Sequence, residues 1–141
     1  MNDTNLSPYL NFSGNCEEAM NFYKSIFGGE LEISRFGDYA SPEMPVDDKY
    51  KNGVMHSTLA GGGVTFMASD GRPGVPVTFG DSVSMSIAGS DEATLTGYFN
   101  GLSEGANVVA PLEKQVWGDK FGMLTDKFGI NWLVNISAQK A

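Results

Sequence analysis

The chain has 141 residues, 41% of them hydrophobic and 18% charged, so it can bury a core and suits one domain. Its 9 basic and 17 acidic residues give a formal net charge of −8 with no basic cluster. Surfaces for nucleic acid or anionic membranes need clustered Lys and Arg, so we expect neither partner. Because the chain has no signal-like N-terminus, no membrane-length apolar run and one cysteine, we expect a cytoplasmic protein.

Hydrophobic periodicity predicts strand, helix and three strands in the first half of the chain. Leu10 and Phe12 alternate with polar neighbours in a half-buried strand. A helix over 16–27 follows, with Asn15 as its N-cap and Gly28 at its end. The expected inner stripe of this helix is Ala19, Phe22, Tyr23 and Ile26. The expected strands lie at about 30–36, 54–60 and 64–69.

The second half repeats this order. Val83, Met85 and Ile87 alternate with serines in a predicted strand, and Ser90 is the expected N-cap of the next helix. Its expected stripe is Leu95, Tyr98, Phe99 and Leu102, and strands follow at about 107–113, 121–125 and 130–136. The sequence therefore predicts an α+β fold of two βαβββ modules, whose curved sheets form a concave cleft. The modules span about 6–70 and 81–137 of a single domain, 1–141, and a Gly/Pro-rich stretch joins them.

Two stretches of the sequence resemble a known family. The first contains Pro8-Tyr9-Leu10-Asn11-Phe12, Gly14-Asn15 and Phe27-Gly28-Gly29-Glu30, and it resembles the glyoxalase/bleomycin-resistance (vicinal oxygen chelate) superfamily. The second is similar to the PhnB-like branch and contains Pro111-Leu112-Glu113-Lys114, Trp117-Gly118-Asp119, Phe121-Gly122, Asp126, Phe128-Gly129, Trp132 and Asn135. The resemblance implies the paired βαβββ modules and usually a homodimer.

The resemblance also implies where a metal site would lie. Catalytic members of the superfamily hold a divalent metal with four His, Glu or Gln side chains. In this sequence the corresponding positions fall at Ser7 or Pro8, Phe66 or Met67, Ser82 or Ser84, and Trp132 or Leu133. None of these side chains supplies an imidazole or a carboxylate, so we expect no metal and no cofactor.

Two residues are candidates for chemistry at the site. His56 is the only histidine, and it is either a hydrogen-bonded strand residue or, if it lies on the inner face with Thr58, the candidate catalytic residue for proton transfer. Cys16 opens the predicted first helix without a partner motif, so we expect a packed structural thiol.

Other candidates would contact a ligand in the cleft. The serines of the predicted strand either bind a polar ligand or form a solvated face, and Trp117 either stacks on a ligand, holds a hairpin or lies at a dimer interface. The acidic segment 38–48 either closes over the cleft or is simply solvated. The candidate ligand-binding residues are Tyr9, Asn11, His56, Met67, Ser82, Ser84, Trp117, Asn131 and Leu133.

These observations favour a metal-independent small-molecule binding protein, whose negative charge suits a neutral or cationic ligand. The alternative is a lyase, isomerase or dioxygenase-type enzyme assisted by His56 or by a metal at Asp70 or Glu113. A third possibility is a structural dimer without a ligand. PhnB-like proteins also carry a methyltransferase label, but the sequence lacks the glycine-rich strand–turn–helix loop of a methyl-donor site.

Overall fold

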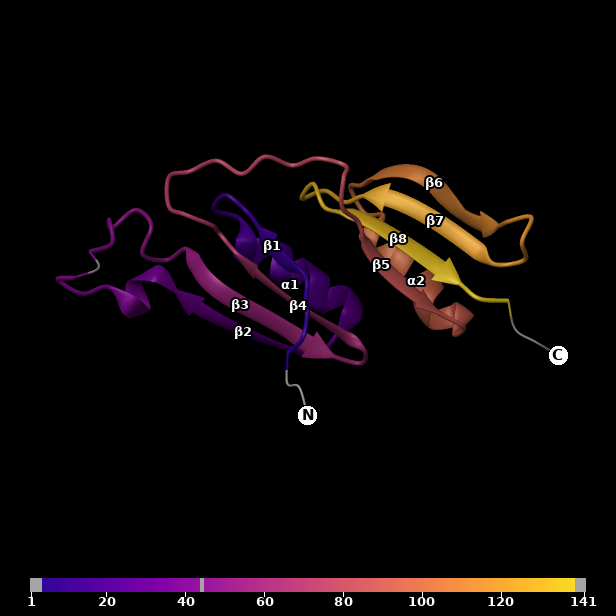
Figure 1. The fold of residues 1–141 in the computed structure, drawn as a ribbon, viewed down its shortest axis with the longest axis horizontal. Helices are drawn as coiled ribbons and strands as arrows, with labels where there is room; N and C mark the ends of the chain where they lie inside the picture. Colours follow the sequence, from indigo (N-terminus) through magenta and orange to yellow (C-terminus); the bar gives the residue numbers. More distant parts are fainter. Residues whose placement is uncertain (1–3, 44, 139–141) are drawn as a thin grey trace. The chain divides into compact units, whose positions relative to one another are not determined.

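The computed structural model describes residues 4–43 and 45–138, and the chain divides into two compact units between Thr78 and Phe79 (Figure 1). Each unit has the order βαβββ, which confirms the predicted α+β class. No helix in the described ranges is both long and apolar enough to cross a bilayer. The first unit contains β1 (Tyr9–Asn11), α1 (Cys16–Phe27), β2 (Glu30–Arg35), the short 3-10 helix η1 (Phe36–Tyr39), β3 (Val54–Gly61) and β4 (Val64–Ser69). The second contains β5 (Met85–Gly89), α2 (Glu92–Leu102), β6 (Asn107–Lys114), β7 (Lys120–Thr125) and β8 (Asn131–Ile136).

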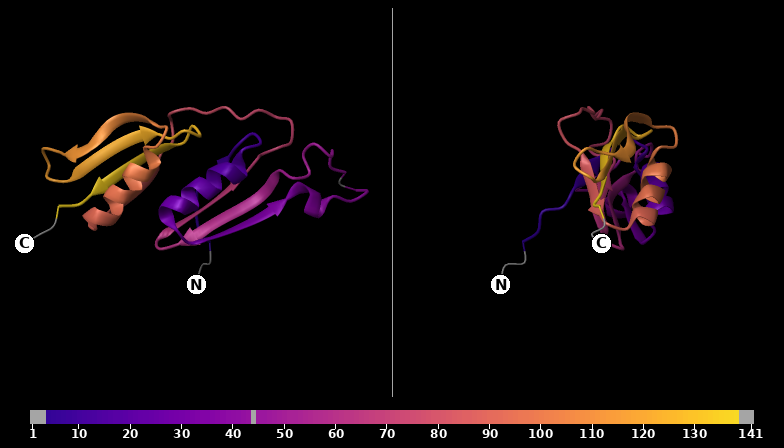
Figure 2. Two further views of the ribbon diagram at one scale, coloured as in Figure 1. Left: turned by 180° about the vertical axis from the view of Figure 1, so that it is seen from behind. Right: turned by 90° about the vertical axis from the view of Figure 1, so that its right-hand side faces the viewer.

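The first unit is a four-stranded sheet covered on one face by α1 (Figure 2). Its strand order is β1-β4-β3-β2, with β1 parallel to β4 and the other pairs antiparallel. Alternate strand residues point to opposite faces, so one set of side chains packs under the helix. The fully buried members of that set include Phe12, Ser57, Leu59, Phe66 and Ala68.

The start of α1 differs from the prediction. The Asn15 side chain makes no capping hydrogen bond, and the backbone N–H of Cys16 donates instead to the Asp70 carboxylate at 2.8 Å. The buried stripe begins at this anchored residue, three positions earlier than expected, so Phe22 and Ile26 are only half-buried at its flank. The buried residues of the helix are Cys16, Ala19, Met20, Tyr23 and Phe27.

The second unit repeats the architecture with the strand order β5-β8-β7-β6 and with α2 against β8 and β5. Trp132, Val134 and Ile136 are buried on the face of the sheet that α2 covers. A Cβ at Gly122 would lie 2.7 Å from the ring of Phe99, so this glycine leaves room for that ring of α2 over β7.

Two details of the second unit correct the sequence analysis. The strand β5 begins at Met85, where pairing with Trp132 starts, so the serines at 82 and 84 precede it. The N-cap of α2 is Asp91 and not Ser90, because the Asp91 carboxylate accepts the backbone N–H of Thr94 at 3.1 Å. Leu95, Phe99 and Leu102 form the buried stripe, as expected, whereas Tyr98 is half-buried.

Candidate functional site

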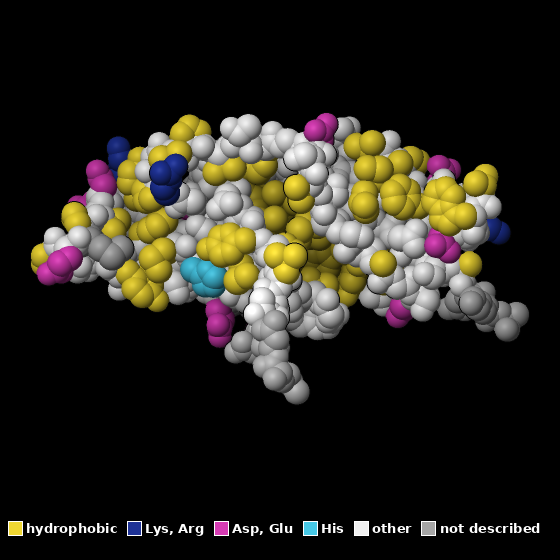
Figure 3. Space-filling view, in the orientation of Figure 1, with side chains coloured by type: hydrophobic (Ala, Val, Ile, Leu, Met, Phe, Trp, Pro, Cys, Tyr) yellow, Lys and Arg dark blue, Asp and Glu magenta, His cyan; other side chains and the backbone are white. Residues whose placement is uncertain are grey.

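The sheet face that α1 leaves uncovered, called the helix-free face below, carries a row of four side chains, one from each strand. The register pairs Tyr9 with Met67, Met67 with Thr58, and Thr58 with Glu32. Cross-strand partners point to the same side of a sheet, so these four residues lie side by side. Figure 3 looks onto this face and shows the chain's single histidine, in cyan, at the surface beside hydrophobic side chains.

That histidine, His56, is held between two hydroxyl groups. Its Nδ1 lies 3.1 Å from the Tyr9 hydroxyl oxygen, and its Nε2 lies 3.2 Å from the Thr58 hydroxyl oxygen. A neutral imidazole donates from one ring nitrogen and accepts at the other, so one hydroxyl donates to the ring and the other accepts from it. The arrangement fixes the ring plane, and each hydroxyl keeps further hydrogen-bonding capacity for a ligand.

The structure therefore brings four predicted residues of the first unit together. Tyr9, His56 and Met67 are neighbours in or next to the row, and Asn11 follows on the same face of β1, in register with Ser69. Because alternate residues of a strand share a face, the sequence already indicated that Thr58 lies on the same face as His56. Glu32 was missed, although the same period-two alternation along the strand from residue 30 identifies it.

The candidates of the second unit have mixed surroundings. Leu133 pairs with Ser86 and Met123 on the face that α2 leaves uncovered. The Asn131 amide donates to two backbone carbonyls that precede β5 and accepts from the Thr125 hydroxyl, so its side chain anchors the chain that enters the strand.

Three further candidates of that unit are exposed. Ser82 and Ser84 lie before β5, so they do not belong to a strand face as predicted. Trp117 is 60% exposed in the β6–β7 connection, and its ring meets Phe121 edge-on with 6.5 Å between the centroids. Contact of these side chains with a ligand stays a prediction.

The side chains at the superfamily's metal positions do not fit a divalent cation. Strand register places Met67 and Leu133 on the uncovered faces, whereas Phe66 and Trp132 are buried under the helices. A thioether and an alkyl chain offer no oxygen or imidazole nitrogen to a hard or borderline metal. Among residues 4–43 and 45–138, no three His, Cys, Asp or Glu side chains converge.

The carboxylate of Asp70 is also fully occupied by the fold. It accepts the backbone N–H groups of Gly14, Cys16 and Val54, each at 2.8 Å, and the residue is 7% exposed. It therefore ties the start of α1 to the start of β3. The same junction buries Cys16, where burial raises the pKa of the thiol to about 12, as suits a packed structural thiol.

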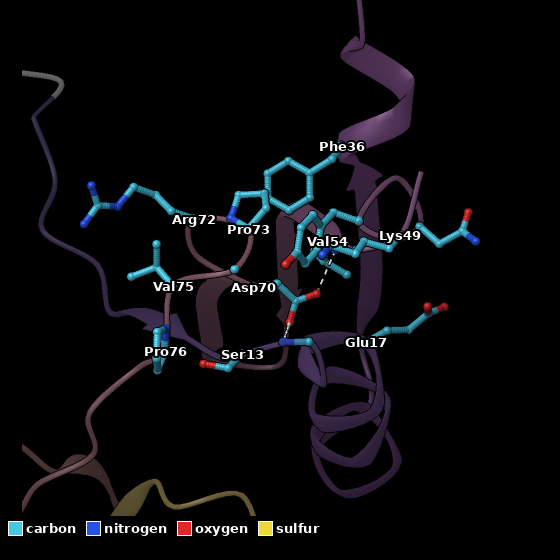
Figure 4. A pocket seen from close by; sticks show the side chains of 15 residues that line it. Ser13, Glu17, Phe36, Lys49, Val54, Asp70, Arg72, Pro73, Val75 and Pro76 are labelled. Atoms are coloured by element: carbon cyan, nitrogen blue, oxygen red, sulfur yellow. Dashed lines mark hydrogen bonds between the residues drawn. The ribbon is translucent and has the colours of Figure 1, made fainter. Parts of the chain in front are cut away.

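A cavity of about 500 Å³ opens beside this carboxylate, where β3 begins and β4 ends (Figure 4). Its walls include Phe36, Tyr50 and Pro73, with Lys49 and Arg72 at its rim, and none of the nine predicted ligand-binding residues lines it. The one sequence signal for it is the Gly/Pro-rich stretch after β4, which we interpreted as the joint between the modules; the residues just before β3 that line the cavity carried no prediction.

The acidic segment 38–48 lies outside the cavity lining, and Met44 within it lies outside the described residues. Asp38 accepts the backbone N–H of Arg35 at 3.0 Å, and Asp47 accepts the backbone N–H of Lys49 at 3.1 Å. These two carboxylates therefore support the local turns.

Comparison with known proteins gives matches over nearly the whole chain. A family model named 3-demethylubiquinone-9 3-methyltransferase matches residues 4–135. The crystal structure of protein PA1353 from Pseudomonas aeruginosa is 40% identical, with a TM-score of 0.83 over 97% of this chain and 100% of that one. A PhnB protein from Bacillus cereus, named as a candidate 3-demethylubiquinone-9 3-methyltransferase, is 27% identical, with a TM-score of 0.74 over 95% and 100%. A glyoxalase/bleomycin resistance protein from Albidiferax ferrireducens T118, 15% identical, shares the fold with a TM-score of 0.57 over 92% and 96%.

Proposed function

Because the chain belongs to the 3-demethylubiquinone-9 3-methyltransferase family, the PhnB-like branch of the glyoxalase/bleomycin-resistance superfamily, we propose that it binds a small organic molecule without a metal. The proposed site is the helix-free face of the first unit. The observation that carries the proposal is His56, whose two ring nitrogens contact the hydroxyls of Tyr9 and Thr58. Fixed polar groups beside apolar surface are what orients a small ligand.

The side chains of the row also indicate the kind of ligand. Met67 and the ring of Tyr9 provide apolar contact, and the hydroxyls provide hydrogen bonds. Exposed Glu32 ends the row, and the chain as a whole has a net charge of −8. Both features repel an anion, so the proposed ligand is a neutral or cationic aromatic molecule.

Among the contacts of the described residues, none favours the alternative of a metal-dependent or His56-assisted enzyme. Methyl transfer, which the family's name suggests, has no counterpart in the residues around α1. The chain between β1 and α1 reads Phe12-Ser13-Gly14-Asn15, and the N–H groups of Gly14 and Cys16 already donate to Asp70. A helix start whose donors are occupied by the protein's own carboxylate is not free to hold an anionic group of a cofactor.

A binding experiment with one matched series of probes tests the proposal. Benzylamine, benzamide and benzoate have similar shapes but carry positive, zero and negative charge. In the protein labelled at methionine methyl groups and backbone amides, we expect benzylamine and benzamide to cause saturable NMR shifts at Met67 and Thr58, and benzoate to cause none there. His56→Ala should abolish these shifts, whereas Ser86→Ala, a control on the second sheet, should not.

The proposal is wrong if neither the cationic nor the neutral probe shifts this face, or if His56→Ala binds them as wild type does. Its metal-free part has a separate test. The melting temperature of chelator-stripped protein should not rise with Zn²⁺, Ni²⁺ or Mn²⁺, because a ligand that binds only the native state must stabilise it. A saturable rise with one metal would contradict the proposal.

We propose further that the protein forms a cytoplasmic homodimer. Several large apolar side chains are exposed in the single chain, including Trp117 at 60%, Val109 at 59% and Val108 at 41%. Exposed apolar surface of this kind is typical of protein–protein contacts. A second copy of the chain is the partner that the superfamily's usual homodimer suggests.

A further inference from the structure

The cavity beside Asp70 is a concave site in the first unit, separate from the helix-free face. It is lined by the β1–α1 loop, the end of the β2–β3 connection and the segment that follows β4. None of Tyr9, His56, Thr58 and Met67 lines it. Its volume of about 500 Å³ lies within the range of small-molecule sites.

Three rings contribute to the wall of the cavity. Figure 4 labels Phe36 and Pro73 there, and Tyr50 belongs to the same lining. A Cβ at Gly74 would lie 2.9 Å from the Tyr50 hydroxyl, and this glycine has a φ of +78°, so only glycine lets the segment approach so closely. The backbone N–H of Val77 donates to the Ser13 hydroxyl at 2.8 Å and fixes the segment to the β1–α1 loop.

Both carboxylates of the lining already have hydrogen-bond donors within the protein. Asp70 accepts three backbone N–H groups, two of which are visible in Figure 4. Glu17 receives two hydrogen bonds from the Arg35 guanidinium, at 2.8 and 2.9 Å, and these bonds lower the pKa of its carboxyl group. Neither carboxylate therefore needs a cationic ligand.

Two cations of the lining, Lys49 and Arg72, have no carboxylate partner of this kind. Within residues 4–43 and 45–138 the ion pairs involve Arg35 and Lys120, and neither Lys49 nor Arg72 takes part in one. Lys49 Nζ lies 5.2 Å from the ring centroid of Tyr50, at the cavity wall. Arg72 extends from the rim into solvent in Figure 4, and an exposed side chain changes rotamer within nanoseconds, so its guanidinium can turn toward a bound molecule.

From this arrangement we infer that the cavity binds a small aromatic carboxylate. The rings of Phe36, Tyr50 and Pro73 receive the apolar body of the molecule. Arg72 and Lys49 bind its carboxylate at the rim, where the planar guanidinium of Arg72 can form a bidentate pair of hydrogen bonds. The cavity thus selects the opposite charge from the helix-free face, although it lies in a chain with a net charge of −8.

Benzoate and its neutral analogue benzamide test this inference. In backbone-amide NMR spectra of the whole chain, benzoate should cause saturable shifts at three glycines of the lining, Gly14, Gly53 and Gly74. Benzamide should bind there about tenfold more weakly, because it lacks the charge that the two cations recognise. The spectra themselves show whether each variant is folded.

Single substitutions test whether the carboxylate of bound benzoate contacts Arg72 and Lys49. Arg72→Gln and Lys49→Gln should each weaken benzoate binding about fivefold, the effect of losing one partly exposed charge contact. Lys51→Gln is the matched control, since it removes the same charge from an exposed neighbour outside the lining, and it should change binding less than about twofold.

The inference is overturned if benzoate leaves the three glycines unshifted, if benzamide binds equally well, or if Lys51→Gln weakens binding as much as Arg72→Gln. The outcome is independent of the proposed function, because the helix-free face is followed at different residues, Thr58 and Met67, and with probes of different charge.

Discussion

At the scale of single residues, Asp70 is the side chain on which most of the first unit's geometry depends. It is almost completely buried, and its two oxygens accept N–H groups from the β1–α1 loop, the first residue of α1 and the first residue of β3. Hydrogen bonds to a charged acceptor are about twice as strong as neutral ones. The carboxylate therefore positions the start of the helix and one wall of the cavity together.

Asp70→Asn should destabilise the protein strongly. The amide has one acceptor oxygen where the carboxylate has two, and its NH₂ group meets a backbone N–H donor. We expect the free energy of unfolding to fall by about 3 kcal/mol in urea denaturation. Asp81→Asn, at an exposed aspartate, should change it by less than about 0.5 kcal/mol, and equal values for the two variants would refute this role of Asp70.

The Glu17–Arg35 pair should make the stability of the folded protein depend on pH in the acidic range. Hydrogen bonds from the guanidinium lower the folded-state pKa of Glu17, so the pair stabilises the protein above the carboxyl's unfolded pKa, and this contribution is lost as pH falls through the lowered folded pKa. Glu17→Gln should therefore melt below wild type at neutral pH, and the difference should disappear in strong acid. The control Glu18→Gln should show no such trend, and a Glu17→Gln difference that is constant with pH would contradict the mechanism.

Residue-scale prediction succeeded where the partners are close in sequence or follow from alternation. The proximity of His56 and Thr58 follows from a separation of two residues on one strand. The contacts of Asp70 with Gly14 span 56 positions, and no periodicity connects them. The sequence therefore indicated which residues lie on the helix-free face. It did not indicate the hydrogen bonds of the buried Asp70 carboxylate or the cavity beside it.

At the scale of elements, the start of α2 gives a sharp test of the corrected cap. The N–H and hydroxyl of Thr94 donate to Asp91 and lower the pKa of its carboxyl group. Asp91→Ala should lower the melting temperature at neutral pH, whereas Asp91→Asn, which keeps a capping oxygen, should lower it less. Because the folded pKa is lowered, the wild-type advantage over Asp91→Asn should be lost as pH falls through it. Ser90→Ala should have a smaller effect than Asp91→Ala; the reverse order would restore Ser90 as the cap.

Elements could be predicted in kind and order because their periodicity is local, but their ends depend on distant groups. The interior of α1 follows the 3.6-residue period, yet its first residue is fixed by Asp70, on another element. The strand β5 has a regular alternation from 82, yet its ladder begins only where β8 supplies Trp132 as a partner for Met85. Ser82 and Ser84, which the alternation assigns to a strand face, therefore lie before β5.

At the scale of the whole molecule, each unit leaves one sheet face uncovered, and each four-stranded sheet has two edge strands. In the second unit the edge strands are β5 and β6, and the first half of β6 is mostly apolar and carries no charge. Val108 and Val109 there are 41% and 59% exposed. Exposed apolar residues on an edge strand can contact another chain, so we propose the first half of β6 as the contact for the second copy, whereas Pro111 and the charged Glu113 and Lys114 disfavour pairing along its second half.

Val109→Lys should therefore weaken the homodimer. In sedimentation equilibrium, wild type should have twice the monomer mass, and a lysine on the edge strand should shift the population toward monomer, because pairing would bury or juxtapose the new charges. Val83→Lys is the matched control: it places the same charge on another exposed valine, but outside every strand, and should leave the dimer intact. A wild-type monomer at all concentrations would refute the dimer. Dissociation by Val83→Lys with an intact Val109→Lys dimer would move the contact away from β6, to the chain that enters β5.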